Sequence, residues 1–243
     1  MTFAATYRLG TRLFWRDRGM LVGSVVTPVG LTIGMPVLMR NVAPEGVAAA
    51  TQVFHGMIAV VLAITTFMTT VVTLTMRRDQ LVLKRLRTTE LTDGQILAGQ
   101  LAGVVTQTVL LVGLSTLAVR VLAGVPLPAN PPLFAAAVVT GAVVMALLAA
   151  AYTAVIPRAE LSAAFAMPVF LLAGVGAGVM GPIPLPSFAR TALDLLPTAA
   201  VADAVRHGEV LAPVLNLAVW TVIGVVSLRL WFRWEPRRSS STS

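Results

Sequence analysis

The chain alternates long apolar runs with short polar connections along most of its length. Six runs are close to 20 residues, the length that an α-helix needs to cross about 30 Å of hydrocarbon at about 1.5 Å per residue. They cover residues 21–39, 53–76, 96–119, 133–156, 161–181 and 213–232. The pattern predicts an all-α, polytopic membrane protein in which residues 20–235 form one domain of six transmembrane helices.

Segments outside these runs predict further elements. In residues 1–19, aromatic side chains fall on one face of a helix and arginines on the other, as in helices that lie in the membrane interface. We expect an amphipathic elbow helix there, with a basic juxtamembrane anchor as the alternative. Thr92 and Gln95 form a capping-box pattern that predicts the start of the third span. Residues 236–243 are predicted to be a disordered cytoplasmic tail.

The connection between the fifth and sixth runs, residues 182–212, is rich in proline but too apolar for an ordinary loop. Its leucines flank Pro197, where a helix would break. Backbone that enters a membrane without spanning it must be covered by protein or line a water-filled cavity. We therefore predict an extracellular re-entrant hairpin of two short helices that are broken at Pro197.

Composition and charge support this membrane topology. Hydrophobic residues make up 57% of the chain, charged residues 12%, and the mean hydropathy is +0.86, which excludes a soluble domain. The cations behind the net charge of +8 sit beside apolar runs, so they predict lipid contact and not nucleic-acid binding. Fourteen of the 18 lie on one side of the predicted topology; the exceptions are Arg40, Arg120, Arg190 and Arg206. Since cytoplasmic connections carry the excess of cations, both termini are predicted to be cytoplasmic.

Motifs of enzymes and ion-coupled transporters are missing from the sequence. The chain has no cysteine, and His55 and His207 lack metal-ligand spacing, so no metal site is predicted. The single lysine, Lys84, has no glycine near it, which excludes the phosphate-binding loop of an ATPase. Ser115 lacks the glycines of a nucleophile motif and is expected to bond its own preceding turn. No acidic residue lies inside a predicted span, which argues against proton coupling.

Mildly polar residues inside the spans are candidates for a substrate path, because four threonines share one face of an α-helix. The candidates are Thr66, Thr69, Thr70 and Thr73 in the second span, Gln107 in the third and Asn216 in the sixth. Alternatively, these hydroxyls bond the preceding turn or a neighbouring helix. Glycine pairs at 30 and 34, 99 and 103, and 174 and 178 favour close helix contacts, within the chain or with a partner subunit.

The densest cluster of charge, in residues 77–95, carries the most specific motif. The stretch "RRDQLVLKRLRTTELTDGQILAGQL" resembles the first cytoplasmic loop in permeases of type-2 ATP-binding-cassette (ABC) exporters. The resemblance implies a cytoplasmic coupling helix that docks on a separate ATPase. The residues placed in this role are Leu83, Lys84, Arg85, Leu86, Arg87, Thr88 and Thr89. Leu81 and Glu90 depart from the family, which commonly has glycine and proline there.

A second stretch, "LLPTAAVADAVRHG", is similar to the family's pattern after the fifth span. In that pattern Pro197 precedes the extracellular re-entrant helices, and Asp203 and Arg206 continue them. The resemblance therefore extends from the elbow helix through the six spans, and the order of the motifs is more specific than either motif alone.

Together these motifs imply a permease subunit of an ATP-driven exporter in the plasma membrane of a bacterium. Its substrate would be an amphipathic drug, antibiotic or lipid-like molecule that leaves the cytoplasm or the inner leaflet. The chain would pair with a second copy of itself, as a homodimer, or with a similar permease. Membrane lipids would surround the pair. The ATPase subunit would hold ATP and Mg²⁺, so this chain is expected to need no cofactor and to be no enzyme itself. The alternatives are a non-transporting membrane immunity or assembly factor and an ATP-independent secondary transporter.

Overall fold

The computed structural model describes residues 22–82, 92–179, 184, 186–208 and 210–232. These residues form helices and no strand, which confirms the predicted all-α class. The α-helices are α3 (Thr27–Val42), α4 (Val47–Val61), α5 (Thr69–Asp79), α7 (Asp93–Ala123), α8 (Pro131–Tyr152), α9 (Ser162–Gly176), α10 (Ser187–Asp194), α11 (Pro197–His207) and α12 (Leu211–Trp231). The shorter elements are the π-helices η1 (Val22–Val26) and η2 (Leu62–Met68) and the 3₁₀-helix η3 (Ala159–Leu161). The predicted elbow helix (1–19), the predicted coupling residues (83–89) and the predicted tail (236–243) lie outside the described residues.

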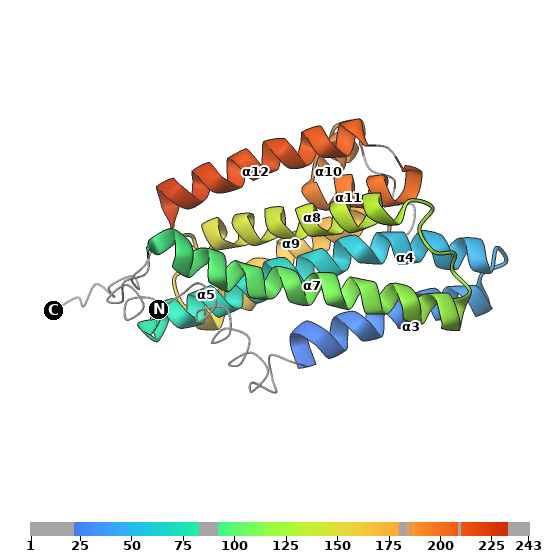
Figure 1. Cartoon of the computed structure of the whole chain (residues 1–243), viewed down its shortest axis with the longest axis horizontal. Helices are drawn as coiled ribbons and strands as arrows, with labels where there is room; N and C mark the ends of the chain where they lie inside the picture. The colour runs from blue at the N-terminus through green and yellow to red at the C-terminus, as the bar shows by residue number, and fades with distance from the viewer. Residues whose placement is uncertain (1–21, 83–91, 180–183, 185, 209, 233–243) are drawn as a thin grey trace.

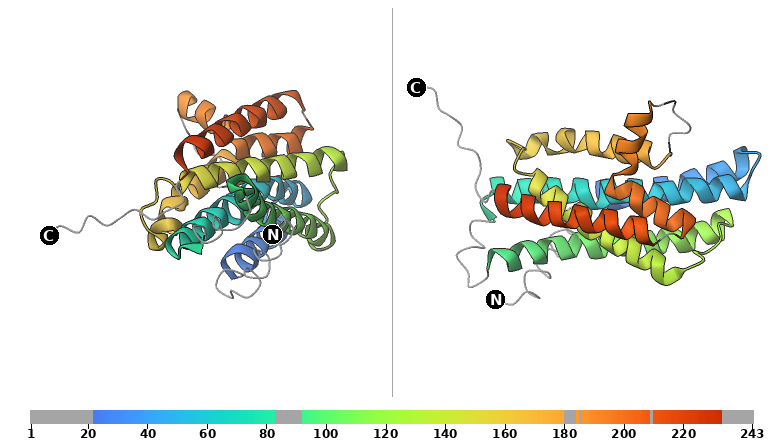
Figure 2. Two further views of the ribbon diagram at one scale, coloured as in Figure 1. Left: turned by 60° about the vertical axis from the view of Figure 1, so that its left-hand side comes forward. Right: turned by 90° about the horizontal axis from the view of Figure 1, so that it is seen from above.

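The long helices run along the long axis of the molecule (Figure 1, Figure 2). α4, η2 and α5 follow one another without a break and form one helix of 33 residues. Five helical stretches are long and apolar enough to cross a membrane: Val47–Asp79, Asp93–Ala123, Pro131–Tyr152, Ala159–Gly176 and Leu211–Trp231. They fall on the second to sixth predicted spans. The first predicted span falls on η1 and α3, of which α3 has only 16 residues, and it stays a prediction.

Several helix ends follow local sequence signals. At the start of α7, the Thr92 side chain accepts a hydrogen bond from the Gln95 backbone N–H, and the Gln95 side chain accepts one from the Thr92 N–H. This arrangement confirms the predicted capping box. α7 and α11 end at Gly124 and Gly208, whose φ angles of 68° and 69° lie in the left-handed region. Glycine enters that region at low cost because it has no Cβ.

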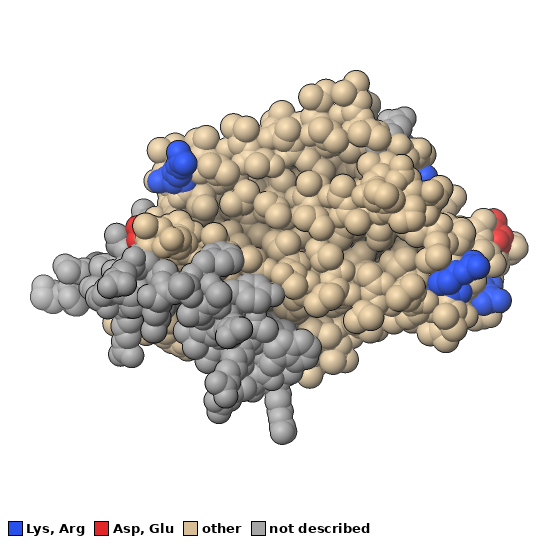
Figure 3. Space-filling model, in the orientation of Figure 1, with Lys and Arg blue, Asp and Glu red and all other residues tan. Residues whose placement is uncertain are grey.

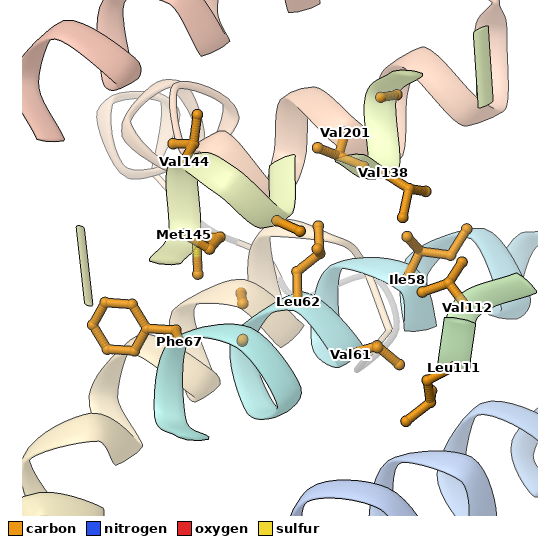
Figure 4. Packing of buried hydrophobic residues seen from close by; sticks show 14 of the residues in the cluster. Ile58, Val61, Leu62, Phe67, Leu111, Val112, Val138, Val144, Met145 and Val201 are labelled. Atoms are coloured by element: carbon orange, nitrogen blue, oxygen red, sulfur yellow. The ribbon is translucent and has the colours of Figure 1, made fainter. Parts of the chain in front are cut away.

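The two short helices α10 and α11 follow α9, and the chain breaks between them directly before Pro197, as the sequence predicts. α11 packs deeply into the bundle. A Cβ added to Gly141, near the middle of α8, would lie 2.4 Å from Val201 Cγ2 and 3.3 Å from Leu62 Cδ1. Val201 and Leu62 belong to the same buried apolar cluster (Figure 4). α11 therefore meets α8 and the 33-residue helix near their middles, while the position of the hairpin in a membrane stays a prediction.

Charged side chains that Figure 3 colours lie toward the two ends of the long axis, and the surface between them on this face is uncharged. At one end α5 and α8 end, α7 and α9 begin, and α12 ends (Figure 1). We call it the α5–α7 end. The turn that joins α3 to α4 lies at the opposite, α3–α4 end. An uncharged band between charged ends is the arrangement expected of helices that cross a bilayer.

Candidate functional site

A groove of about 420 Å³ runs between η1–α3, α5 and α7. We call it the α3–α5–α7 groove. Its lining is mostly apolar and comes from one face of each helix. The lining residues are Val25, Val29 and Ile33 from η1 and α3; Thr70, Thr73, Leu74 and Arg77 from α5; and Gly99, Gln100, Leu101, Gly103, Val104, Thr106, Gln107, Leu110, Leu111, Leu114, Ser115 and Ala118 from α7.

The groove is almost as long as a bilayer is thick. Between Gly99 and Ala118, both of which line the groove, α7 rises by about 28 Å at about 1.5 Å per residue, close to the hydrocarbon thickness of ~30 Å. Leu110 and Leu114 line it yet are 61% and 67% exposed. The groove is therefore open along one side and is not a closed internal cavity.

Two hydroxyls in the groove have no hydrogen-bond partner among the described residues. They are Thr70 Oγ1 on α5 and Ser115 Oγ on α7, and both atoms are buried. The expectation that Ser115 bonds its own preceding turn is therefore wrong. An unpaired buried hydroxyl costs free energy, so a ligand that supplies a hydrogen-bonding atom at either position would recover part of that cost. Gln100 and Arg77 add polar groups toward the α5–α7 end.

The groove contains only part of the predicted substrate path. Thr70, Thr73 and Gln107 line it together. Thr66 and Thr69 do not line it, although the α-helical spacing places all four threonines on one face.

The hydroxyls of these two threonines have partners elsewhere. Thr66 Oγ1 lies 2.8 Å from Thr108 Oγ1 on α7, and Thr69 Oγ1 donates to the Ile64 carbonyl at 3.3 Å. Thr66 lies inside η2, and a π-helix has more residues per turn than an α-helix, so Thr66 does not keep the α-helical register with Thr70 and Thr73. For Thr66 and Thr69 the structure shows the alternative arrangement, a bond to a neighbouring helix and a bond to the preceding turn.

Asn216, the remaining candidate for the path, lies on α12 away from the groove lining. Its Nδ2 donates to the Leu195 carbonyl at 2.9 Å, and Trp220 Nε1 donates to the same oxygen at 2.7 Å. Leu195 ends α10. Asn216 and Trp220 therefore hold the break between α10 and α11 against α12.

The three predicted hairpin residues are all on α11. Pro197 begins the helix and is buried, and Asp203 is half-buried in its second half. Arg206, in the last turn, donates through Nη2 to the Ala177 carbonyl at the end of α9. The structure thus brings Arg206 to the end of the fifth predicted span, and it places all three residues apart from the groove.

The chain approaches the predicted coupling residues through Leu81. This leucine has φ 58° and is the one non-glycine residue with positive φ in the described part of the chain. Glycine is favoured in that region because a Cβ meets the following backbone there. The position at which the resembling family commonly has glycine is therefore one where this backbone needs a left-handed residue.

Reasoning from the sequence missed several groove residues. It treats Arg77 only as a topological charge and does not single out Gln100 or the η1–α3 wall. The signal that finds the α7 side is a stripe at helical spacing that runs from Gln100 through Gln107 to Ser115. Since the residues in this stripe are polar but uncharged, it is a weaker sequence signal than the apolar periodicity of the spans.

An open, mostly apolar groove with a few hydrogen-bonding groups suits an elongated amphipathic molecule. In comparisons with known proteins, the family model described as "ABC-2 family transporter protein" matches residues 27–227. No curated protein sequence matches the chain. The matched residues include α3, α5 and α7, and thus all of the groove lining except Val25.

Proposed function

The chain belongs to the ABC-2 family of transporter proteins, and we propose that it is the permease subunit of an ATP-driven exporter. The observation that carries the proposal is the family match over residues 27–227. This family supplies membrane subunits that work with a separate ABC ATPase. Five apolar helices of membrane-spanning length agree with a multi-pass membrane subunit.

The substrate of this exporter is an amphipathic drug, antibiotic or lipid-like molecule, and it moves along the α3–α5–α7 groove. The groove supports this because its length is close to a hydrocarbon thickness and its wall is apolar. Thr70 and Ser115 supply hydroxyls for polar groups of the substrate, and Arg77 supplies a cation toward the α5–α7 end. Contacts of this kind hold an amphipathic molecule loosely enough for it to leave again.

A second copy of the chain closes the open side of the groove and completes the path. Close to that side, α3 carries Gly30 and Gly34, at which an added Cβ would meet nothing within 4 Å. Small exposed residues let a neighbouring membrane helix approach closely. A homodimer is the simplest such assembly, and a similar permease would close the groove in the same way.

The ATPase subunit holds ATP and Mg²⁺ and docks on residues 83–89 at the α5–α7 end. Cations and leucines alternate in that segment, so it offers both charge and apolar side chains to a soluble partner. Replacing Arg85 and Arg87 by glutamate should release the ATPase from the purified complex. A complex that survives both substitutions would place the docking site elsewhere.

The test of the function begins with the full-length chain purified from bacterial membranes in mild detergent, with identification of the proteins that remain bound. The complex is then reconstituted in inside-out vesicles with ATP, Mg²⁺ and a fluorescent amphipathic dye. We expect an ATPase subunit to co-purify and the dye to accumulate only when ATP is hydrolysed. Dye transport that persists without ATP and stops when the proton gradient collapses would instead identify a secondary transporter. Protection of cells from a toxic compound without any ATPase would identify an immunity factor.

The groove is tested by filling it. Gly103 lines the groove, and a Cβ added there would meet nothing within 4 Å, so the side chain of Gly103→Phe starts in open space and should fill the groove. Gly113→Phe is the matched control on α7, since a Cβ added to Gly113 also meets nothing within 4 Å but Gly113 does not line the groove. Gly103→Phe should abolish dye transport while the ATPase stays bound, and Gly113→Phe should transport normally. Equal transport by both variants would show that the substrate takes another route.

A further inference from the structure

The end of α5 is tied to the connection between α8 and α9 by two adjacent charged residues. Arg78 is 1% exposed. Its Nη1 donates to the Thr153 carbonyl at 3.0 Å and its Nη2 donates to the Ile156 carbonyl at 2.9 Å. Its Nε lies 3.3 Å from Asp79 Oδ1. The other carboxylate oxygen of Asp79 accepts a hydrogen bond from the Ala159 backbone N–H at 2.7 Å.

These contacts pair groups at helix ends. Ala159 begins η3, where N–H groups have no partner within the helix. Thr153 follows the last residue of α8, and its carbonyl also accepts a hydrogen bond from the Ile156 N–H at 3.2 Å. A guanidinium is planar and presents its donors as a rigid fork, so one arginine can hold two carbonyls at once. Asp79 supplies the opposite charge that a buried guanidinium requires.

Arg78 and Asp79 are well placed to transmit motion. The helix that carries them contains α4, η2 and α5, and the predicted docking residues 83–89, here called the docking segment, follow just beyond its end. Through Arg78 and Asp79, a displacement of α5 reaches the end of α8 and the start of α9, to which the docking segment has no chain connection of its own. Without them, the segment would act directly only on α5 and α7.

We propose that Arg78 and Asp79 are positioning residues that make the end of α5 and the α8–α9 connection move as one body, so that closure of the ATPase drives α8 and α9 as well as α5. This inference rests on the proposed function. Neither Arg78 nor Asp79 lines the α3–α5–α7 groove. They act by holding the two cytoplasmic connections of the permease in a fixed relation while the docking segment moves.

The first measurement is a distance within the full-length chain in lipid nanodiscs. The chain has no cysteine, so Gln80→Cys and Glu160→Cys, both at exposed positions, place two spin labels without other substitutions. We expect a narrow distance distribution in the parent protein and a broad one after Arg78→Ala or Asp79→Asn. Arg158→Ala removes one exposed cation from the same connection and is the matched control, with an unchanged distribution. A distribution that stays narrow after Arg78→Ala would overturn the proposal.

The second measurement is the amount of dye transported per ATP hydrolysed by the purified complex. For Arg78→Ala we expect the ATPase to stay bound and hydrolysis to continue, while transport per ATP falls by about tenfold, the size of a typical coupling between sites. Arg78→Lys keeps the positive charge but loses the forked guanidinium, so its transport per ATP should lie between those of the parent protein and Arg78→Ala. If transport per ATP is unchanged although the distance has broadened, the two residues only cap helix ends and the proposal is wrong.

A rescue covers the case in which Arg78→Ala does not fold. In the Arg78→Lys background, Asp79→Cys and Ala159→Cys place two thiols where the native side chain already reaches the native backbone. Joining them with a short thiol crosslinker should restore transport per ATP, and a reducible linker should lose the effect again on reduction. A crosslinked variant that remains uncoupled would contradict the proposal. If the parent complex itself shows no ATP-driven transport, the proposed function is wrong. This outcome is seen in the parent protein, so it is distinguishable from a failure of the variants.

Discussion

Replacing Gly141 by alanine tests whether α11 packs against the middle of α8. The added Cβ would lie 2.4 Å from Val201 Cγ2, whereas carbon atoms in contact are about 3.5–4.0 Å apart, so the Val201 side chain or one of the helices must shift by about 1 Å. Over-packing of this kind costs about 1–3 kcal/mol. For a chain of this size, at about 2–4 °C per kcal/mol, we expect a drop in Tm of roughly 2–12 °C. The assay is thermal unfolding of the purified full-length protein in one detergent, followed by circular dichroism.

A second substitution separates this contact from a general intolerance to change. Val201→Ala removes the clashing methyl group, and alone it should cost about 2 kcal/mol from lost burial. The double variant Gly141→Ala, Val201→Ala should lose less free energy of unfolding than the sum of the two single variants, because the new Cβ occupies the space that the valine leaves. Gly113→Ala, where the added Cβ meets nothing within 4 Å, should leave Tm unchanged or raise it. The packing of α11 at this depth is refuted if Gly141→Ala is as stable as the parent protein and the two substitutions are additive.

Three further substitutions test local features by the same unfolding assay. Leu81→Gly should stabilise the chain by about 1 kcal/mol, because φ 58° strains a leucine and not a glycine; an equal gain from Leu81→Ala would contradict this cause. Thr92→Ala removes the capping hydroxyl of α7 and should cost about 1 kcal/mol, with faster hydrogen exchange in the first turn of α7; unchanged exchange there would argue against the cap. Trp220→Phe keeps an aromatic ring but removes the donor to the Leu195 carbonyl, and it should cost about 1 kcal/mol and speed proteolysis between α10 and α11; unaltered proteolysis would show that this bond does not hold the hairpin.

The sequence predicts the helices well because their causes are local. The apolar runs locate five membrane-length helices, Pro197 locates the break between α10 and α11, and the pair Thr92 and Gln95 locates the start of α7. Each signal depends on side chains within a few residues of the feature that it predicts. The family resemblance in the docking segment likewise depends on contiguous residues, and the family match over residues 27–227 confirms it.

The groove was harder to predict because its geometry depends on contacts between distant residues. No residue type in η2 is a signal for a π-helix. Yet the π-helix changes the register of Thr66 relative to Thr70, so that Thr70 lines the groove while Thr66 bonds Thr108 on α7. In the same way, Arg78 looks in the sequence like one more cation that orients the chain. Its role follows only from carbonyls of Thr153 and Ile156, which are far away in the sequence.

Arginines at helix ends also account for cations that the positive-inside rule does not explain. Arg40 donates through Nη1 to the Leu122 carbonyl at the end of α7, and Arg206 donates to the Ala177 carbonyl at the end of α9. Both belong to the four cations that the predicted topology places on the outer side. The C-terminal end of a helix carries partial negative charge and carbonyls without a partner in the helix, so a guanidinium from a neighbouring helix stabilises it on either side of a membrane. Arg78 does the same at the end of α8, but with two carbonyls and a carboxylate. The same physical contact therefore serves as a structural cap at the α3–α4 end and, beside the docking segment, as the proposed link between two moving parts.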